Sequence, residues 1–261
     1  MSRPEDLNPA NAADTGLSSL KSQLAADARI ALIGAMDQEI ELLKQSISGL
    51  QQQSIAGFLF LTGTIGQFDV VLLKSGIGKV NAAVGTALLL DHFKPTCVIN
   101  TGSAGGFDPS LSVGDVVIST EVRHHDVDLT VFGYEIGQMA RMPAAYEADP
   151  LLVDVAEASV EKMSGMACSR GLIATGDTFM SDPDHVARTR ANFPQMKAAE
   201  MEAAAIAQTC FCFGTPFLVI RALSDIAGQE SNVSFEQFIE TASENSAQMV
   251  LNILAELERR I

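Results

Sequence analysis

Positive charge is scarce in this sequence, which has 17 Lys and Arg residues against 32 Asp and Glu residues. The resulting net charge of −15 repels nucleic-acid phosphates, and no run of basic residues offsets it locally. We therefore expect no nucleic-acid partner.

Long apolar runs are also missing, since none approaches the roughly 18 residues that a membrane span needs. The first 28 residues lack the apolar central region of a signal peptide and are rich in Asn, Asp, Ser and Ala. We expect no membrane contact, a disordered or weakly helical extension over residues 1–28, and a single soluble domain over residues 29–261.

Cysteine is infrequent, and the four cysteines do not have the spacing of metal ligands. Cys210 and Cys212 are separated by one residue inside an apolar stretch. We interpret all four, including Cys97 and Cys168, as reduced core residues of a cytoplasmic protein.

Apolar runs and helical spacing alternate along residues 29–261. The runs predict strands at 29–34, 58–64, 70–75, 97–100, 116–122, 171–175 and 216–222, and a hairpin joins the second and third. Helices are predicted at 37–46, 81–93, 151–163, 201–212 and 234–259. The pattern predicts an α/β fold with a mainly parallel or mixed sheet covered on both faces. Residues 123–146 form a long loop, either a lid or a subunit contact.

Three carboxylates follow strand ends, where ligands bind in such sheets. Asp225 comes shortly after strand 216–222, where partial burial would raise its pKa and make it a proton donor, although it could instead cap the next helix. Glu202 begins a helix and either grips adjacent hydroxyls of a ribose or complements the helix dipole. Glu39 either activates a water or serves as a first-turn acid. Their joint placement favours chemistry over separate structural roles.

Two other motifs are incomplete. His124-His125-Asp126 has no third spaced ligand set, so we expect no metal. The segment Gly76-Ile77-Gly78-Lys79 lacks the first glycine and the final Ser or Thr of a phosphate-binding loop. Binding of a nucleoside triphosphate is not supported.

Seven segments in unbroken order together resemble one family. They are Ile33-Gly34-Ala35-Met36 with Glu39, Lys74-Ser75-Gly76-Ile77-Gly78-Lys79, Asn100-Thr101-Gly102-Ser103-Ala104-Gly105-Gly106, Phe132-Gly133-Tyr134, Gly176-Asp177, Glu200-Met201-Glu202 and Arg221-Ala222-Leu223-Ser224-Asp225. From about residue 29 to the C-terminus, the sequence resembles the bacterial 5'-methylthioadenosine/S-adenosylhomocysteine nucleosidases.

The resemblance implies a three-layer nucleoside phosphorylase-like fold, with a mixed central sheet flanked by helices. It also implies a homodimer, no metal or other cofactor, and hydrolysis of the bond between adenine and a 5'-thio-substituted ribose. By the same resemblance, Asp225 is the general acid at adenine N7 and Glu39 the base that activates water. Glu202 holds the ribose 2'- and 3'-hydroxyls, with Met201 against the sugar.

The resemblance assigns supporting roles to further residues. Ser103 and Arg221 would position the water and the carboxylate that activates it, and Ser224 would orient the general acid. Backbone groups of Phe179 and Met180 would read the adenine edge, while the Phe179 ring stacks on the base.

The sugar and 5'-thio pocket would be lined by Met36, Ile77 and Phe235. Leu129 and Phe132 match positions through which one subunit closes its partner's site. Met180 stands where the family often has Ile, which leaves the preferred 5'-substituent open.

Three alternatives remain from the sequence. A nucleoside phosphorylase would use phosphate, but the segment Met36-Asp37-Gln38-Glu39 is acidic where that anion would bind. A related hydrolase would act mainly on aminodeoxyfutalosine or 5'-deoxyadenosine. A noncatalytic nucleoside-binding protein would keep the fold without the chemistry, against which the three carboxylates argue.

Overall fold

An eleven-stranded mixed sheet organises the computed structural model, which describes residues 20–24, 28–160, 163, 166–229 and 231–261. The strands are β1 (Arg29–Gly34), β2 (Ser48–Ile55), β3 (Phe58–Ile65), β4 (Phe68–Lys74), β5 (Cys97–Asn100), β6 (Ser103–Gly106), β7 (Val116–His124), β8 (Tyr146–Glu147), β9 (Cys168–Thr175), β10 (Met196–Glu200) and β11 (Phe217–Ile226). Their order in the sheet is β2-β3-β4-β1-β5-β11-β6-β10-β9-β7-β8.

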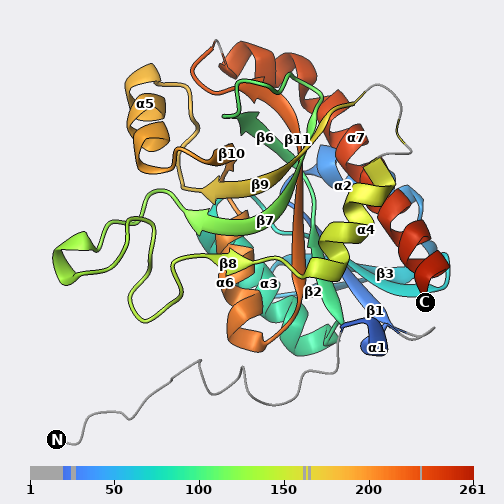
Figure 1. The fold of residues 1–261 in the computed structure, drawn as a ribbon. Coiled ribbons are helices and arrows are strands. Elements are labelled where there is room, and N and C mark those ends of the chain that lie inside the picture. Colours follow the sequence, from blue (N-terminus) through green and yellow to red (C-terminus); the bar gives the residue numbers. More distant parts are fainter. Residues whose placement is uncertain (1–19, 25–27, 161–162, 164–165, 230) are drawn as a thin grey trace, which may run out of the picture.

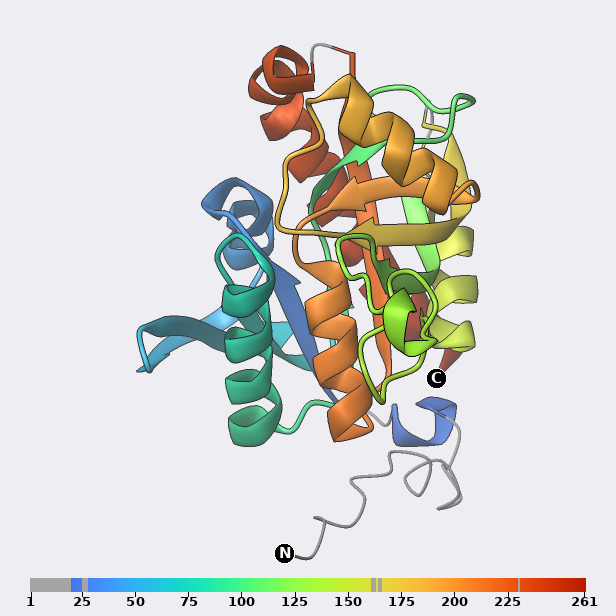
Figure 2. The same ribbon diagram turned by 90° about the vertical axis from the view of Figure 1, so that its left-hand side faces the viewer.

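Helices cover both faces of this sheet (Figures 1 and 2). They are α1 (Leu20–Gln23), α2 (Asp37–Gln45), α3 (Lys79–Phe93), α4 (Pro150–Val160), α5 (Pro183–Asn192), α6 (Ala203–Phe213) and α7 (Ser231–Arg260). Helices α2 and α4 pack against α7 on one face, while α3 and α6 pack together on the other. The predicted three-layer α/β fold with a mixed sheet is confirmed.

Strand β11 is the centre of the fold. It runs parallel to β5 and β6 and antiparallel to β7, so that β11, β6, β10, β9 and β7 form a closed circuit of hydrogen-bonded strands. Nine of its ten residues are buried, in keeping with an apolar run covered on both faces. Such a strand can place a polar side chain deep inside the molecule.

Among the described residues, the sequence patterns do not predict the strands β2, β6, β8 and β10 or the helix α5. Strand β2 is almost wholly exposed and reads Ser-Gly-Leu-Gln-Gln-Gln-Ser-Ile, so it shows no alternation and exists through its antiparallel pairing with β3. Strands β6 and β10 are rich in Gly and Ala, which have low strand propensity. Helix α5 is mainly polar and begins at Pro183 after an Asp182 cap.

The predicted N-terminal extension and the predicted long loop can be compared with the structure. Most of the predicted extension 1–28 lies outside the described residues, but Leu20 and Leu24 are buried against the core. Residues between β7 and β8 hold one short 3-10 turn, Thr130–Phe132, in a long irregular segment that extends from the body of the molecule (Figure 1). Within the described residues, no helix has the length and hydropathy that a membrane crossing requires.

Candidate active site

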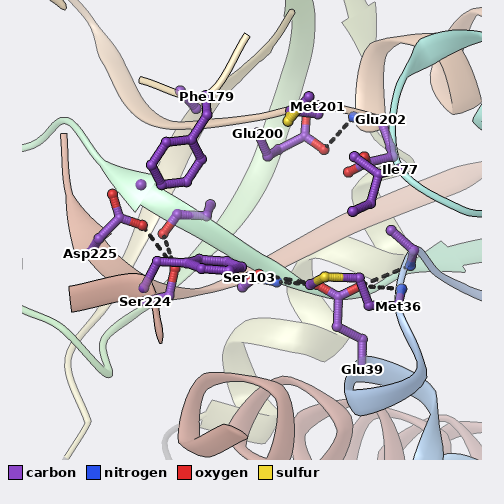
Figure 3. Close-up of a pocket in the computed structure, with 15 residues that line it drawn as sticks. Met36, Glu39, Ile77, Ser103, Phe179, Glu200, Met201, Glu202, Ser224 and Asp225 are labelled. Carbon is purple, nitrogen blue, oxygen red and sulfur yellow. Dashed lines mark hydrogen bonds between the residues drawn. The ribbon is translucent and has the colours of Figure 1, made fainter. Parts of the chain in front are cut away.

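One cavity of about 220 Å³ collects most of the predicted site residues (Figure 3). It is lined by Ala35, Met36, Glu39, Ile77, Ser103, Ala104, Gly105, Phe179, Ala199, Glu200, Met201, Glu202, Ser224, Asp225 and Phe235. These residues come from the ends of β1, β10 and β11, the start of β6, two loops and the first turns of α2 and α7. Among the described residues that line it, none is Lys, Arg or His.

Asp225 lies at one side of the cavity, next to Ser224 and Phe179 (Figure 3). Its Oδ1 accepts a hydrogen bond of 2.9 Å from the Ser224 hydroxyl. Burial raises the pKa of Asp225, and the Ser224 hydrogen bond opposes that rise. The residue belongs to β11, which ends before α7 begins at Ser231, so the alternative in which Asp225 caps a helix is wrong.

Glu39 lies at the opposite side and is held by four hydrogen bonds. Its Oε2 accepts the backbone N–H groups of Ala35 at 2.8 Å and Met36 at 3.1 Å. Its Oε1 accepts the Ser103 N–H at 3.0 Å and the Ser103 hydroxyl at 3.1 Å. Glu39 therefore satisfies the N-terminus of α2, as a first-turn acid does, and also presents a fixed carboxylate to the cavity.

Glu202 occupies a third side of the cavity. Its Oε1 accepts the Gly78 N–H at 2.8 Å, and its side chain makes no capping hydrogen bond with α6. Burial and the neighbouring Glu200 carboxylate raise the pKa of Glu202. A buried carboxylate bound by a single donor keeps acceptor positions free for ligand hydroxyls.

Glu200 is a lining residue that the sequence-based set of site residues omits. Its Oε2 forms an ion pair of 2.6 Å with Arg221 and accepts the N–H groups of Glu202 at 3.0 Å and Ala203 at 2.8 Å. The Thr175 hydroxyl donates to its other oxygen. Glu200 thus fixes the backbone that carries Glu202. The sequence feature that indicates Glu200 as a site residue is its position two residues before Glu202, at the edge of an apolar segment.

Arg221, which the resemblance expects to position the water and its activating carboxylate, lies next to the cavity but not in its lining. It is buried, and its Nη2 binds Asn100 Oδ1 at 2.7 Å as well as Glu200. Its side-chain hydrogen bonds go to groups of Asn100, Ile220 and Glu200. Arg221 acts on the site through Glu200 and the end of β5.

Phe179 and Phe235 form an aromatic pair at the cavity, with ring centroids 5.6 Å apart and planes at 76°. Both rings line the cavity, as predicted, and Phe179 is 40% exposed. Met180, whose backbone groups are predicted to read the adenine edge, is not among the residues that line the cavity. Its side chain is buried in a second apolar cluster and its carbonyl accepts the Gly228 N–H at 3.3 Å.

Leu129 and Phe132 lie away from this cavity, on the long segment between β7 and β8. Phe132 is 75% exposed and its neighbour Val131 is 84% exposed. Neither residue contributes to the cavity of its own chain, so a role in a site requires a second copy.

The two adjacent histidines have different neighbours. His124 Nε2 lies 3.0 Å from Gln208 Oε1, whereas the His125 ring packs on His185. Burial lowers the pKa of both imidazoles. In the part of the chain that the structure describes, no group of three or more His, Cys, Asp or Glu side chains is placed to hold a metal ion.

A family model described as the phosphorylase superfamily matches residues 29–255, and thus spans the whole sheet and nearly all of α7. This match defines the class, an α/β enzyme of that superfamily. A 5'-methylthioadenosine/S-adenosylhomocysteine nucleosidase of Lysinibacillus sphaericus is 60% identical over 229 residues, which are 88% of this chain and 100% of the relative.

Solved structures agree with this match. The nucleosidase of Colwellia psychrerythraea in complex with adenine has a TM-score of 0.87 and 53% identity, over 88% of this chain and 96% of that one. The nucleosidase of Neisseria meningitidis in complex with methylthio-immucillin-A has a TM-score of 0.85 and 49% identity, over 87% and 98%. The chain belongs to the 5'-methylthioadenosine/S-adenosylhomocysteine nucleosidase family, as the sequence motifs predict.

Proposed function

We propose that this chain hydrolyses the N-glycosidic bond of 5'-methylthioadenosine and S-adenosylhomocysteine, and also that of 5'-deoxyadenosine. The products are adenine and the 5'-substituted ribose. The observation that carries the proposal is one cavity with a buried Asp225 at one side, a hydrogen-bonded Glu39 at the opposite side and Glu202 at a third. The names of the relatives and the ligands of the solved structures support the substrate class.

Cleavage of an N-glycosidic bond builds positive charge on the ribose and negative charge on the leaving base. Protonated Asp225 donates its proton to adenine N7, so that the electron pair of the breaking bond between C1' and N9 is accepted by a neutralised base. The anionic carboxylate of Glu39 stabilises the oxocarbenium-like sugar from the other side. An acid and an anion on opposite sides of the sugar suit this transition state.

Glu39 also takes a proton from the attacking water, whose oxygen forms the new bond to C1'. The four acceptor positions of its carboxylate are all used in the structure, two of them by Ser103. A hydroxyl proton can rotate, so the Ser103 hydroxyl can turn to the water and free one position on Oε1. Ser103 then orients the water while its N–H keeps the carboxylate in place.

Water is favoured over phosphate as the nucleophile because the cavity offers no cation. None of its described lining residues is basic, and the nearby Arg221 is neutralised by Glu200. A phosphate placed beside Glu39 would meet like charge in a partly desolvated site. Hydrolysis follows from this charge distribution.

The test is adenine release from 5'-methylthioadenosine, S-adenosylhomocysteine, 5'-deoxyadenosine, adenosine and aminodeoxyfutalosine, each with and without phosphate. We expect phosphate-independent release that is fastest from the two thio-nucleosides. Release that requires phosphate and yields a ribose 1-phosphate would identify a phosphorylase. Much faster release from aminodeoxyfutalosine would reassign the substrate, and binding without any release would support a noncatalytic role.

Glu202 is proposed to accept hydrogen bonds from the ribose 2'- and 3'-hydroxyls. Glu202→Gln leaves one acceptor oxygen where the carboxyl group has two, so one of the two ribose hydroxyls loses its partner and KM rises by about 10- to 100-fold. Steady-state kinetics with 5'-methylthioadenosine measures this change. Glu147→Gln, the same substitution at an exposed position of β8, is the control. An unchanged KM in the Glu202 variant would remove Glu202 from ribose binding.

We also propose a homodimer in which Leu129 and Phe132 close the partner's cavity at the 5' end. Exposed apolar side chains support this proposal, since such side chains often mark a protein–protein interface. Val131 and Phe132 on the long segment and Val80 on α3 are each at least 74% exposed. Phe132→Ser should raise the dimer dissociation constant and KM for the thio-nucleosides together, measured by sedimentation and kinetics. Leu50→Ser on the exposed strand β2 is the control, and a dimer unaffected by Phe132→Ser contradicts this arrangement.

A cytoplasmic location completes the proposal. It is supported by four free cysteines, in keeping with a reducing compartment. Cys97 and Cys210 are buried as predicted, but Cys168 and Cys212 are exposed, so the prediction of four core cysteines is wrong for these two. Fractionation of cells that produce the protein tests the location, and recovery in a secreted or membrane fraction would contradict it.

A further inference from the structure

Ser246, in the middle of α7, contacts the turn that joins β5 to β6. The Gly102 N–H donates to Ser246 Oγ at 2.9 Å, and the Thr101 hydroxyl forms a hydrogen bond with the same oxygen. Ser246 and Thr101 are both buried. Removing the Ser246 hydroxyl would leave a buried amide and a buried hydroxyl without their partner.

The same turn holds the carboxylate of Glu39. Ser103, the residue after Gly102, donates both its N–H and its hydroxyl to Glu39 Oε1. A Cβ atom at Gly102 would lie 2.8 Å from Glu39 Oε1, so the backbone and the carboxylate are in direct contact. A shift of this turn therefore displaces the carboxylate.

Backbone hydrogen bonds to neighbouring strands hold one side of the turn. The Thr101 N–H donates to the Ile33 carbonyl at 2.9 Å, and the Gly102 carbonyl accepts the Ala222 N–H at 3.0 Å. These bonds lie within the strand layer. Ser246 provides the contact from the helical layer, on a helix that also packs against β11 and α2.

We propose that Ser246 is a positioning residue for the reaction, which holds the Thr101–Ser103 turn so that Glu39 points at the water and at C1'. The inference rests on the proposed function, because it assigns to Ser246 the orientation of the proposed base. Ser246 touches no substrate atom. Its effect is on the rate of the chemical step and much less on substrate binding.

The experiment compares Ser246→Ala with Ser243→Ala. Ser243 lies one turn earlier on α7 and is also buried, but its hydroxyl has no hydrogen-bond partner among the described residues. We expect Ser246→Ala to lower kcat for 5'-methylthioadenosine by about 10- to 100-fold, since a small displacement of a catalytic group has effects of this size. KM should change by less than about threefold. Ser243→Ala should match the wild type in both.

A double-variant cycle separates positioning from general damage. If Ser246 acts through Glu39, adding Ser246→Ala to Glu39→Gln lowers kcat little further, whereas independent effects multiply. Thr101→Val removes the other hydroxyl at nearly constant volume, and gives a second measurement if Ser246→Ala does not fold. We expect it also to lower kcat more than it raises KM.

The outcomes distinguish the inference from the proposed function. Equal kcat values for Ser246→Ala and Ser243→Ala in an active enzyme would overturn the inference and leave the hydrolysis intact. If the losses of kcat from Ser246→Ala and Glu39→Gln multiplied fully in the double variant, the inference would also be overturned and the hydrolysis would stand. A wild-type protein that releases no adenine would instead overturn the proposed function and, with it, the role of Ser246.

Discussion

We expect Asp225→Asn to lower kcat for adenine release from 5'-methylthioadenosine by about 10²–10⁴-fold, the usual contribution of a general acid. The amide has no acidic proton to give to adenine N7, yet it keeps the shape of the side chain and can still accept the Ser224 hydrogen bond. Binding of adenine, measured by calorimetry, should therefore fall much less than kcat. Because the lost interaction exists only in the transition state, kcat and kcat/KM should fall together.

The pH dependence tests the same assignment. Burial raises the pKa of Asp225 above its ordinary value, so the acid form persists to higher pH than in an exposed aspartate. The general acid is present below this pKa and is lost as the pH rises through it. The alkaline fall of kcat/KM in the wild type should be weakened or absent in the residual activity of Asp225→Asn.

Asp91→Asn, the same change at an exposed position of α3, is the matched control and should leave kcat unchanged. If Asp225→Asn abolished adenine binding as completely as turnover, the result would indicate collapse of the pocket. An unaltered kcat would remove the residue from the chemistry.

Glu39→Gln is the second change with a large expected effect, a loss of about 10²–10⁴-fold in kcat. Glutamine cannot take a proton from water and places no negative charge near the developing oxocarbenium ion. Its amide nitrogen would also face one of the four donors that Glu39 now accepts. A loss of stability should therefore accompany the loss of rate.

Thermal unfolding and steady-state kinetics together separate these two effects. The control is Glu41→Gln, two residues further along α2, where the carboxylate is exposed and bonded to Gln45. We expect this control to keep wild-type kinetics. If Glu39→Gln retained wild-type kcat, another group would have to activate the water.

Three of the four carboxylates that line the cavity, Asp225, Glu39 and Glu202, could be predicted from sequence because each stands at the edge of an apolar element, where a buried charge is costly without a function. Glu39 follows the apolar strand β1, Asp225 lies near the end of the largely apolar strand β11, and the helical spacing after Glu39 and Glu202 is regular. The fold class follows from the same alternation of strands and helices. The local hydrophobic pattern is sufficient to predict a strand or helix when burial of the whole segment determines its structure.

Other parts of the site depend on contacts that no local pattern encodes. Arg221 stands inside an apolar strand, which signals a buried partner, but the sequence does not say that this partner is Glu200. Strands β6 and β10, which bring Ser103 and Glu200 to the cavity, consist largely of Gly and Ala and exist because β11 and β9 pair with them. Their structure is imposed by the sheet.

Helix α7 contacts both sides of the cavity at once. Its Ser234 hydroxyl donates to the Ser224 carbonyl, next to the proposed general acid, while Ser246 accepts a hydrogen bond from the turn beside the proposed base. Twelve residues of helix put these two contacts roughly 18 Å apart along its axis. A continuous helix is stiff over this length, so it fixes the distance between the two ends of the cavity where Asp225 and Glu39 are proposed to transfer protons. Flexibility introduced between these contacts would loosen that spacing without changing any catalytic group.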